Sequence, residues 1–67
     1  MDNDDYKDLE GLANKYSISE IVDQLADLCI KLSDHCKDVG NKSMAKEYDE
    51  AFDLLEDTAA SLENIGV

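Results

Sequence analysis

Apolar residues recur every three or four positions along two long stretches of the chain. The first stretch contains Ile18, Ile21, Val22, Leu25, Leu28, Cys29, Leu32, Cys36 and Val39, and the second contains Met44, Tyr48, Ala51, Phe52, Leu55, Ala59, Leu62 and Ile65. This period is that of one face of an α-helix. The pattern predicts one helix over residues 18–39 and a second over residues 43–64.

Signals for helix ends flank these stretches. Ser17 with Glu20 forms an S-x-x-E capping box before the first stretch, and Gly40 stands where a helix-terminating glycine is expected. Only about four residues connect the two helices, and such a short connection makes them antiparallel neighbours. We therefore expect an all-α fold built on a helical hairpin.

The N-terminal part of the chain predicts a shorter third helix. Tyr6, Leu9, Leu12, Ala13 and Tyr16 follow the same spacing, which indicates a helix at about residues 4–15 that lies across the hairpin. Gly11 weakens this helix by about 1 kcal/mol relative to alanine. Residues 1–5, which include three aspartates, are expected to be a disordered acidic terminus, and residues 1–67 to form one domain.

A domain of this size buries only about 60% of its unfolded surface, so its core needs reinforcement. Ile30 and Leu54 fall outside the two apolar faces, and Leu62 lies at the edge of the second. We interpret these three residues as contacts of a homodimer in which two hairpins form a helical bundle. The alternative is that they are isolated exposed side chains, which are common on soluble proteins.

Charge restricts the classes of partner. The chain has 17 Asp and Glu residues, six Lys and no Arg, for a net charge of −11. Direct nucleic-acid binding requires cations at the phosphates and is not expected. There is no apolar run long enough to span a membrane and no cationic start of a signal peptide, which predicts a cytoplasmic protein without membrane contact.

The residue types that carry catalysis or bind metals do not gather in the sequence, so neither an enzyme nor a cofactor is expected. The aspartates at the N-terminus resemble the start of a calcium loop, but Lys7 and Ala13 stand where that loop needs Gly and Glu. His35 and Cys36 are adjacent, about 100° apart on a helix, and do not converge on one metal.

Cys29 and Cys36 lie seven residues apart, about 10.5 Å along a helix axis, which is too far for an intrachain disulfide. They are expected to be small buried thiols in a reduced cytosol. An intermolecular disulfide and metal ligation are the alternatives.

The second predicted helix carries an unusual excess of acid, with seven carboxylates and no cation from Glu47 onwards. Five of them form a ridge: Asp49, Glu50, Asp53, Glu56 and Asp57. Like charges one turn apart repel, and acids near a helix C-terminus oppose its dipole. The ridge therefore indicates a binding surface for a basic partner, with carboxylates spaced in a manner similar to DNA phosphates. The alternative is a solvated face that keeps the protein soluble.

Several short segments resemble those of short, uncharacterised phage-encoded helical proteins. They are Lys15-Tyr16-Ser17-Ile18, Ile21-Val22, Leu25-Ala26-Asp27-Leu28-Cys29, His35 and Ala45-Lys46-Glu47-Tyr48, within about residues 15–60. This sequence departs from that pattern by lacking Arg, by having Asp34 rather than Glu before His35, and by having Tyr48 where Trp is frequent. The resemblance implies a viral accessory protein that acts in the host cytoplasm.

These observations lead to a small acidic protein that inhibits a host nucleic-acid-binding protein by presenting a DNA-like carboxylate face. A second hypothesis is an oligomer that sequesters nucleotides through the lysines near the hairpin turn, which are Lys31, Lys37, Lys42 and Lys46. A third is a structural component of the virus particle.

Overall fold

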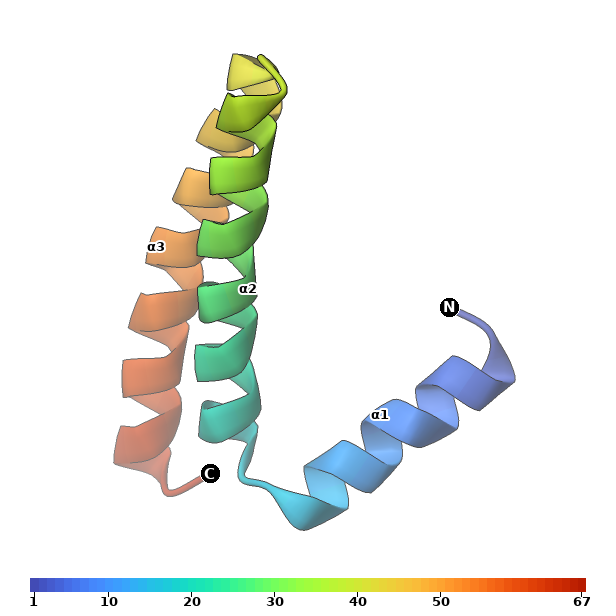
Figure 1. Cartoon of the computed structure of the whole chain (residues 1–67). Coiled ribbons are helices and arrows are strands. Elements are labelled where there is room, and N and C mark those ends of the chain that lie inside the picture. The colour runs from blue at the N-terminus through green and yellow to red at the C-terminus, as the bar shows by residue number, and fades with distance from the viewer.

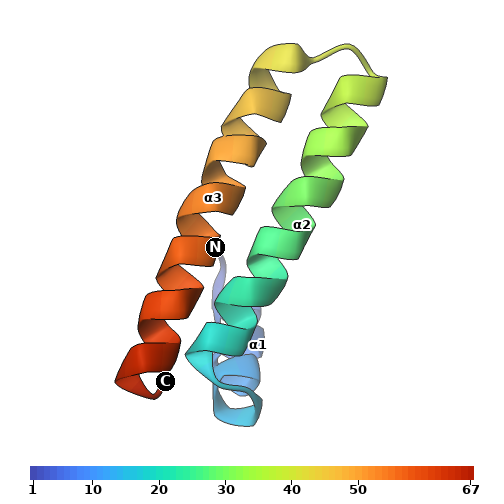
Figure 2. The same cartoon turned by 90° about the vertical axis from the view of Figure 1, so that its left-hand side faces the viewer.

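The computed structural model describes residues 1–67 and contains three helices and no strand: α1 (Asn3–Lys15), α2 (Ile18–Asp38) and α3 (Lys42–Ile65). α2 and α3 lie side by side and antiparallel (Figures 1 and 2). The all-α class and the hairpin are thus confirmed, and the helices begin and end within one residue of the expected positions. None of the three helices combines the length and the apolar character needed to cross a membrane.

The ends of α2 follow from the residues that flank it. The Ser17 side chain accepts a hydrogen bond from the Glu20 amide at 3.2 Å and so caps the helix N-terminus. At the other end Gly40 adopts a φ of +81°, and the Asn41 amide donates to the Cys36 carbonyl at 2.7 Å. This arrangement is a Schellman motif, which turns the chain toward α3 because glycine adopts a positive φ without strain.

α1 begins at Asn3, one residue before the expected start, with the Asp2 side chain accepting from the Asp5 amide at 3.0 Å. Its direction differs from the expectation, because it does not lie across the hairpin. It leaves α2 at an angle, as the arm of a V (Figure 1), and none of its residues is buried.

The hairpin core consists of small residues. The buried positions are Ser19, Ala26 and Ser33 on α2 and Ala45 and Ala59 on α3. On α2 they recur every seven residues, so they form one line along the helix that faces its partner. Small side chains on this line let the two backbones approach closely, and larger residues such as Phe52 and Leu55 are only half-buried on α3.

A backbone hydrogen bond closes the open end of the hairpin. The Ser19 amide, near the start of α2, donates to the Val67 carbonyl oxygen at 2.9 Å. Gly66, with a φ of +97°, ends α3 and turns the chain toward α2. The last residue of the chain is thereby held beside the junction of α1 and α2.

Candidate functional site

The acidic ridge, comprising Asp49, Glu50, Asp53, Glu56 and Asp57, lies on the continuous helix α3. Four of its members are exposed, and Asp49 is partly buried. Neighbours three or four residues apart have Cβ atoms about 5–6 Å from each other on a helix surface. The fold therefore presents a row of carboxylates to solvent.

Asp49 has a structural role that distinguishes it from the rest of the ridge. Its carboxylate accepts a hydrogen bond from the Ser33 hydroxyl at 2.6 Å and lies 3.6 Å from the Lys37 ammonium. Both partners belong to α2, so Asp49 joins the two helices of the hairpin. The Lys37–Asp49 contact is the one ion pair in the structure, and the other four carboxylates of the ridge have no cationic partner.

Ser33 is a position of contact between α2 and α3 that the periodicity of large apolar residues does not reveal. Its side chain is buried, and its hydroxyl lies 3.1 Å from the Ala45 carbonyl as well as 2.6 Å from Asp49. A hydroxyl has one proton to donate, so the shorter contact to a charged acceptor dominates. The sequence feature that could have identified Ser33 is its spacing, because Ser19, Ala26 and Ser33 are small residues at intervals of seven.

The residues expected at a dimer interface do not share one surface of the hairpin. Ile30 precedes Ser33 and Lys37 by three and seven positions, so it lies on the side of α2 that contacts Asp49. Leu54 is 68% exposed and is rotated from Asp49 by about 140° around α3 at 3.6 residues per turn. Leu62 is half-buried.

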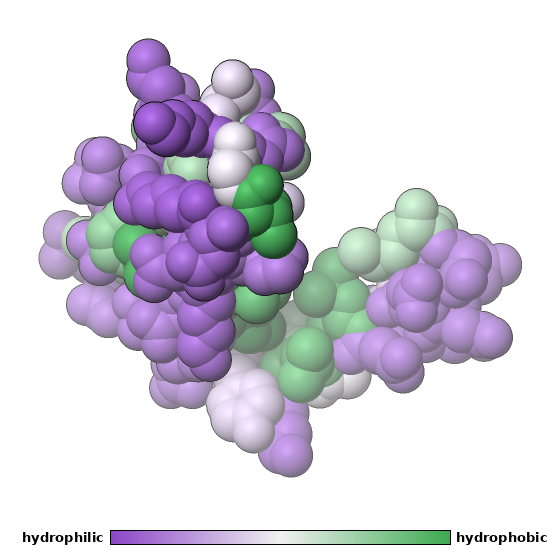
Figure 3. Space-filling model, turned by 45° about the horizontal axis from the view of Figure 1, so that its top comes forward, coloured by the Kyte–Doolittle hydropathy of each residue, from purple (hydrophilic) through white to green (hydrophobic).

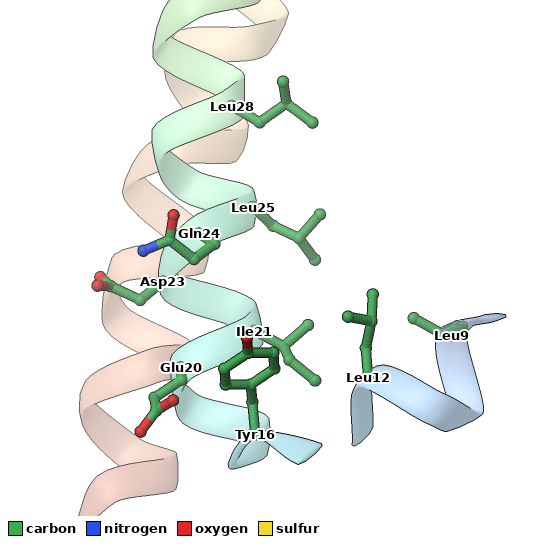
Figure 4. A pocket seen from close by; sticks show the side chains of 9 residues that line it. All are labelled: Leu9, Leu12, Tyr16, Glu20, Ile21, Asp23, Gln24, Leu25 and Leu28. Carbon is green, nitrogen blue, oxygen red and sulfur yellow. The ribbon is translucent and has the colours of Figure 1, made fainter. Parts of the chain in front are cut away.

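An apolar groove separates α1 from α2. Its apolar walls are formed by Leu9, Leu12 and Tyr16 from α1 and the α1–α2 junction, and by Ile21, Leu25 and Leu28 from α2. Glu20, Asp23 and Gln24 complete the lining of this space of about 700 Å³. The two walls are visible as hydrophobic surface where α1 leaves the hairpin (Figure 3), and Figure 4 shows Leu25 and Leu28 extending from α2 toward the side where α1 lies.

The sequence pattern assigned Leu25 and Leu28 to the face that packs inside the hairpin. In the structure they are 45% and 49% exposed, because Ala26 and Ser33 occupy the line of contact with α3 and turn the two leucines outward. Apolar periodicity alone does not identify which part of a broad apolar face meets the partner helix.

A smaller hollow lies near the hairpin turn. Lys37, Lys42 and Lys46 surround it together with Ala45 and Asp49, and its volume is about 360 Å³. Three of the four lysines proposed for nucleotide binding are thus brought together, and Lys31 is not among the lining residues. Asp49 places one negative charge in the same hollow.

The cysteines and the histidine, which are the other residues able to react or to bind a metal, do not form a cluster. Cys29 and Cys36 are unpaired and half-buried on α2, and His35 is exposed on the same helix. No three His, Cys, Asp or Glu side chains converge in a way that would hold a metal ion.

Comparison with protein-family models, with curated proteins and with solved structures finds no match to this chain.

Proposed function

We propose that this protein is an acidic binding module whose ridge on α3 docks on the basic surface of a partner. The observation that carries the proposal is that Glu50, Asp53, Glu56 and Asp57 are exposed and have no cationic partner. Repulsion between such neighbours costs a few tenths of a kcal/mol per pair. A partner that supplies Lys and Arg would offset this cost on binding.

The partner class that fits best is a nucleic-acid-binding protein. Such proteins present clusters of Lys and Arg that neutralise phosphates, and a rigid helix offers carboxylates to the same groups at a regular spacing. Competition with nucleic acid for that surface would make the protein an inhibitor. The resemblance to phage proteins suggests a viral accessory protein with a host target.

The role of Asp49 narrows the proposed contact surface. Because its carboxylate is held by Ser33 and Lys37 of α2, it contributes less free charge than its neighbours. The ridge therefore acts chiefly through the four unpaired carboxylates, and Asp49 sets the position of α3 relative to α2.

The test is capture of partners from host lysate by the immobilised protein, followed by release with a short DNA duplex. We expect the captured protein to be released by the duplex and by high salt, since both weaken contacts between a basic surface and carboxylates. Release by salt but not by an excess of duplex would contradict DNA mimicry.

A variant and a matched control give this test its specificity. Glu50→Gln, Asp53→Asn, Glu56→Gln and Asp57→Asn together should abolish capture. The control neutralises four exposed acids of α1 instead, through Asp4→Asn, Asp5→Asn, Asp8→Asn and Glu10→Gln, which changes the net charge equally. Equal capture by the two variants would mean that the ridge is only a solvated surface.

A second candidate function is nucleotide binding at the hollow formed by Lys37, Lys42 and Lys46. The observation that favours it is that three lysines line one hollow beside the first turn of α3, where the helix dipole also favours an anion. Titration calorimetry with ATP tests it. Binding that is lost in the double variant Lys42→Gln and Lys46→Gln would favour this function over the acidic ridge.

We also propose that the protein is a homodimer, as expected for a hairpin whose core is limited to a few small residues. A third hypothesis is that the protein is a structural component of a virus particle. The number of copies of this protein in purified particles would test it.

A further inference from the structure

The apolar groove between α1 and α2, at about 700 Å³, is larger than the hollow at the hairpin turn, at about 360 Å³, and is lined mainly by apolar side chains. α1 has an apolar face but no buried residue, and the leucines on the opposite wall are nearly half-exposed. Two apolar walls that face each other across open space leave room for a third element between them.

The exposed area supports an occupant as large as a protein subunit. The chain exposes 5207 Å², whereas a compact monomer of its mass exposes about 4,200 Å². The difference of about 1,000 Å² is close to the roughly 800 Å² that each partner buries in a standard interface. A small ligand in the groove would cover only a fraction of this excess.

The shape of the chain leads to the same conclusion. The Cα atoms extend 38 × 31 × 13 Å, and α1 projects from the two-helix hairpin as one arm of the open V in Figure 1. Stable domains consist of at least two packed layers, but α1 has no second layer against which its apolar face is buried. A second copy of the chain supplies this layer.

We propose that the groove is filled by a second copy of this chain, with α1 of each protomer lying in the groove of the other. Such an interface is self-complementary, because each chain carries both a groove and the amphipathic helix that fills it, as two-fold symmetry requires. The length of α1, 13 residues or about 20 Å, is sufficient for it to pack along the exposed leucines of α2.

This inference rests on the homodimer proposed above and gives it a location. It places the contacts in the groove instead of at Ile30, Leu54 and Leu62. It is independent of the acidic ridge, because the groove is lined by α1 and α2 and the ridge lies on α3. Loss of dimerisation and loss of partner capture can therefore be measured separately.

Charge distinguishes a second copy from a basic helix of another protein. Each copy carries a net charge of −11, so two copies repel each other and salt should strengthen the dimer by screening. A basic helix in the groove would be attracted to Glu20 and Asp23, and salt would weaken its binding.

Sedimentation equilibrium at micromolar to millimolar concentration tests the assembly. We expect a mass of twice 7.4 kDa and a dissociation constant that falls as sodium chloride is raised. A mass of 7.4 kDa over this range, or a dimer that salt weakens, would overturn the proposal.

Three variants locate the interface. Leu28→Asp and, separately, Leu9→Asp should each raise the dissociation constant at least tenfold. Leu9 belongs to α1, outside the hairpin, so its replacement leaves the core intact. Leu54→Asp is the matched control, since Leu54 is more exposed than either and lies outside the groove. A dimer lost in Leu54→Asp but retained in the other two would overturn the proposal.

Nuclear Overhauser effects in a mixture of isotope-labelled and unlabelled chains provide a direct readout. Cross-peaks between the Tyr6 and Tyr16 rings of one copy and the Leu25 and Leu28 methyl groups of the other are expected. A dimer whose intermolecular cross-peaks come only from α3 would be incompatible with the proposed arrangement. Partner capture by Leu28→Asp, measured in parallel, shows whether the ridge functions without the dimer.

Discussion

At the scale of single residues, small side chains determine how closely α2 and α3 approach. Ala26 is 1% exposed and lies between the buried residues Ser19 and Ser33. Close packing at these positions leaves no room for additional methyl groups. The same residues turn Leu25 and Leu28 out of the hairpin, so they shape the groove as well as the core.

Ala26→Leu should therefore destabilise the hairpin by about 1–3 kcal/mol through overpacking. Ala60→Leu is the control, because Ala60 is exposed on α3 and a substitution there is expected to change stability by less than about 0.5 kcal/mol. Thermal melts followed by circular dichroism compare the two. Equal melting temperatures would show that α2 and α3 are not packed tightly at Ala26.

Two aspartates of the acidic ridge should respond differently to the same substitution. Asp49→Ala removes the closer acceptor of the buried Ser33 hydroxyl and the Lys37 ion pair, but the Ala45 carbonyl remains as an acceptor, so the expected cost is about 0.5–1.5 kcal/mol. Asp53→Ala removes an exposed, unpaired carboxylate and should leave stability unchanged or slightly higher. Urea unfolding of both variants is the measurement, and a stability gain in Asp49→Ala would rule out its role in joining the helices.

At the scale of elements, the sequence is sufficient to predict the helices and their ends. Ser17 and Gly40 act as expected because capping and positive φ are local properties of a few residues. The line of contact within the hairpin was not predicted. It depends on which small residues from two helices meet, and the period of large apolar residues contains no information on that choice.

Glycines 11 and 40 should differ in their response to alanine. Gly11 lies within α1 with open space around its Cα, so Gly11→Ala should stabilise α1 by about 1 kcal/mol and raise helicity. Gly40→Ala should cost about 1–2 kcal/mol, because its φ of +81° strains a residue with a Cβ. Far-UV circular dichroism and melting curves measure both. A Gly11→Ala protein with unchanged helicity would indicate that α1 does not behave as an independent helix.

At the scale of the whole molecule, the direction of α1 could not be predicted from the sequence. Its apolar face indicates that it packs against something, but the pattern does not say whether the partner is its own hairpin or another chain. The five residues expected for partner binding share one helix, as predicted, and the structure adds that Asp49 alone among them has a side-chain hydrogen bond and an ion pair to α2. The dimer contacts expected at Ile30, Leu54 and Leu62 remain a prediction, and the groove between α1 and α2 is a second candidate surface for dimerisation.

Self-repulsion should make stability depend on ionic strength. The chain has a net charge of −11 and one ion pair. Salt therefore stabilises the fold more by screening the repulsion between carboxylates than it destabilises it by weakening the ion pair. The melting temperature should rise with sodium chloride, and less steeply in the variant that neutralises Glu50, Asp53, Glu56 and Asp57. A melting temperature that decreases with salt in the wild type would contradict this account.

The hydrogen bond from the Ser19 amide to the Val67 carbonyl makes one proton a reporter on the whole hairpin. In an isolated helix the amide of the second residue has no partner and exchanges freely with solvent. Here its protection requires that the last residue of the chain be in place beside the start of α2. The exchange rate of this single amide therefore measures how often the two ends of the hairpin separate, and comparing it with amides at the middle of α2 would show whether unfolding begins at the ends or throughout the hairpin.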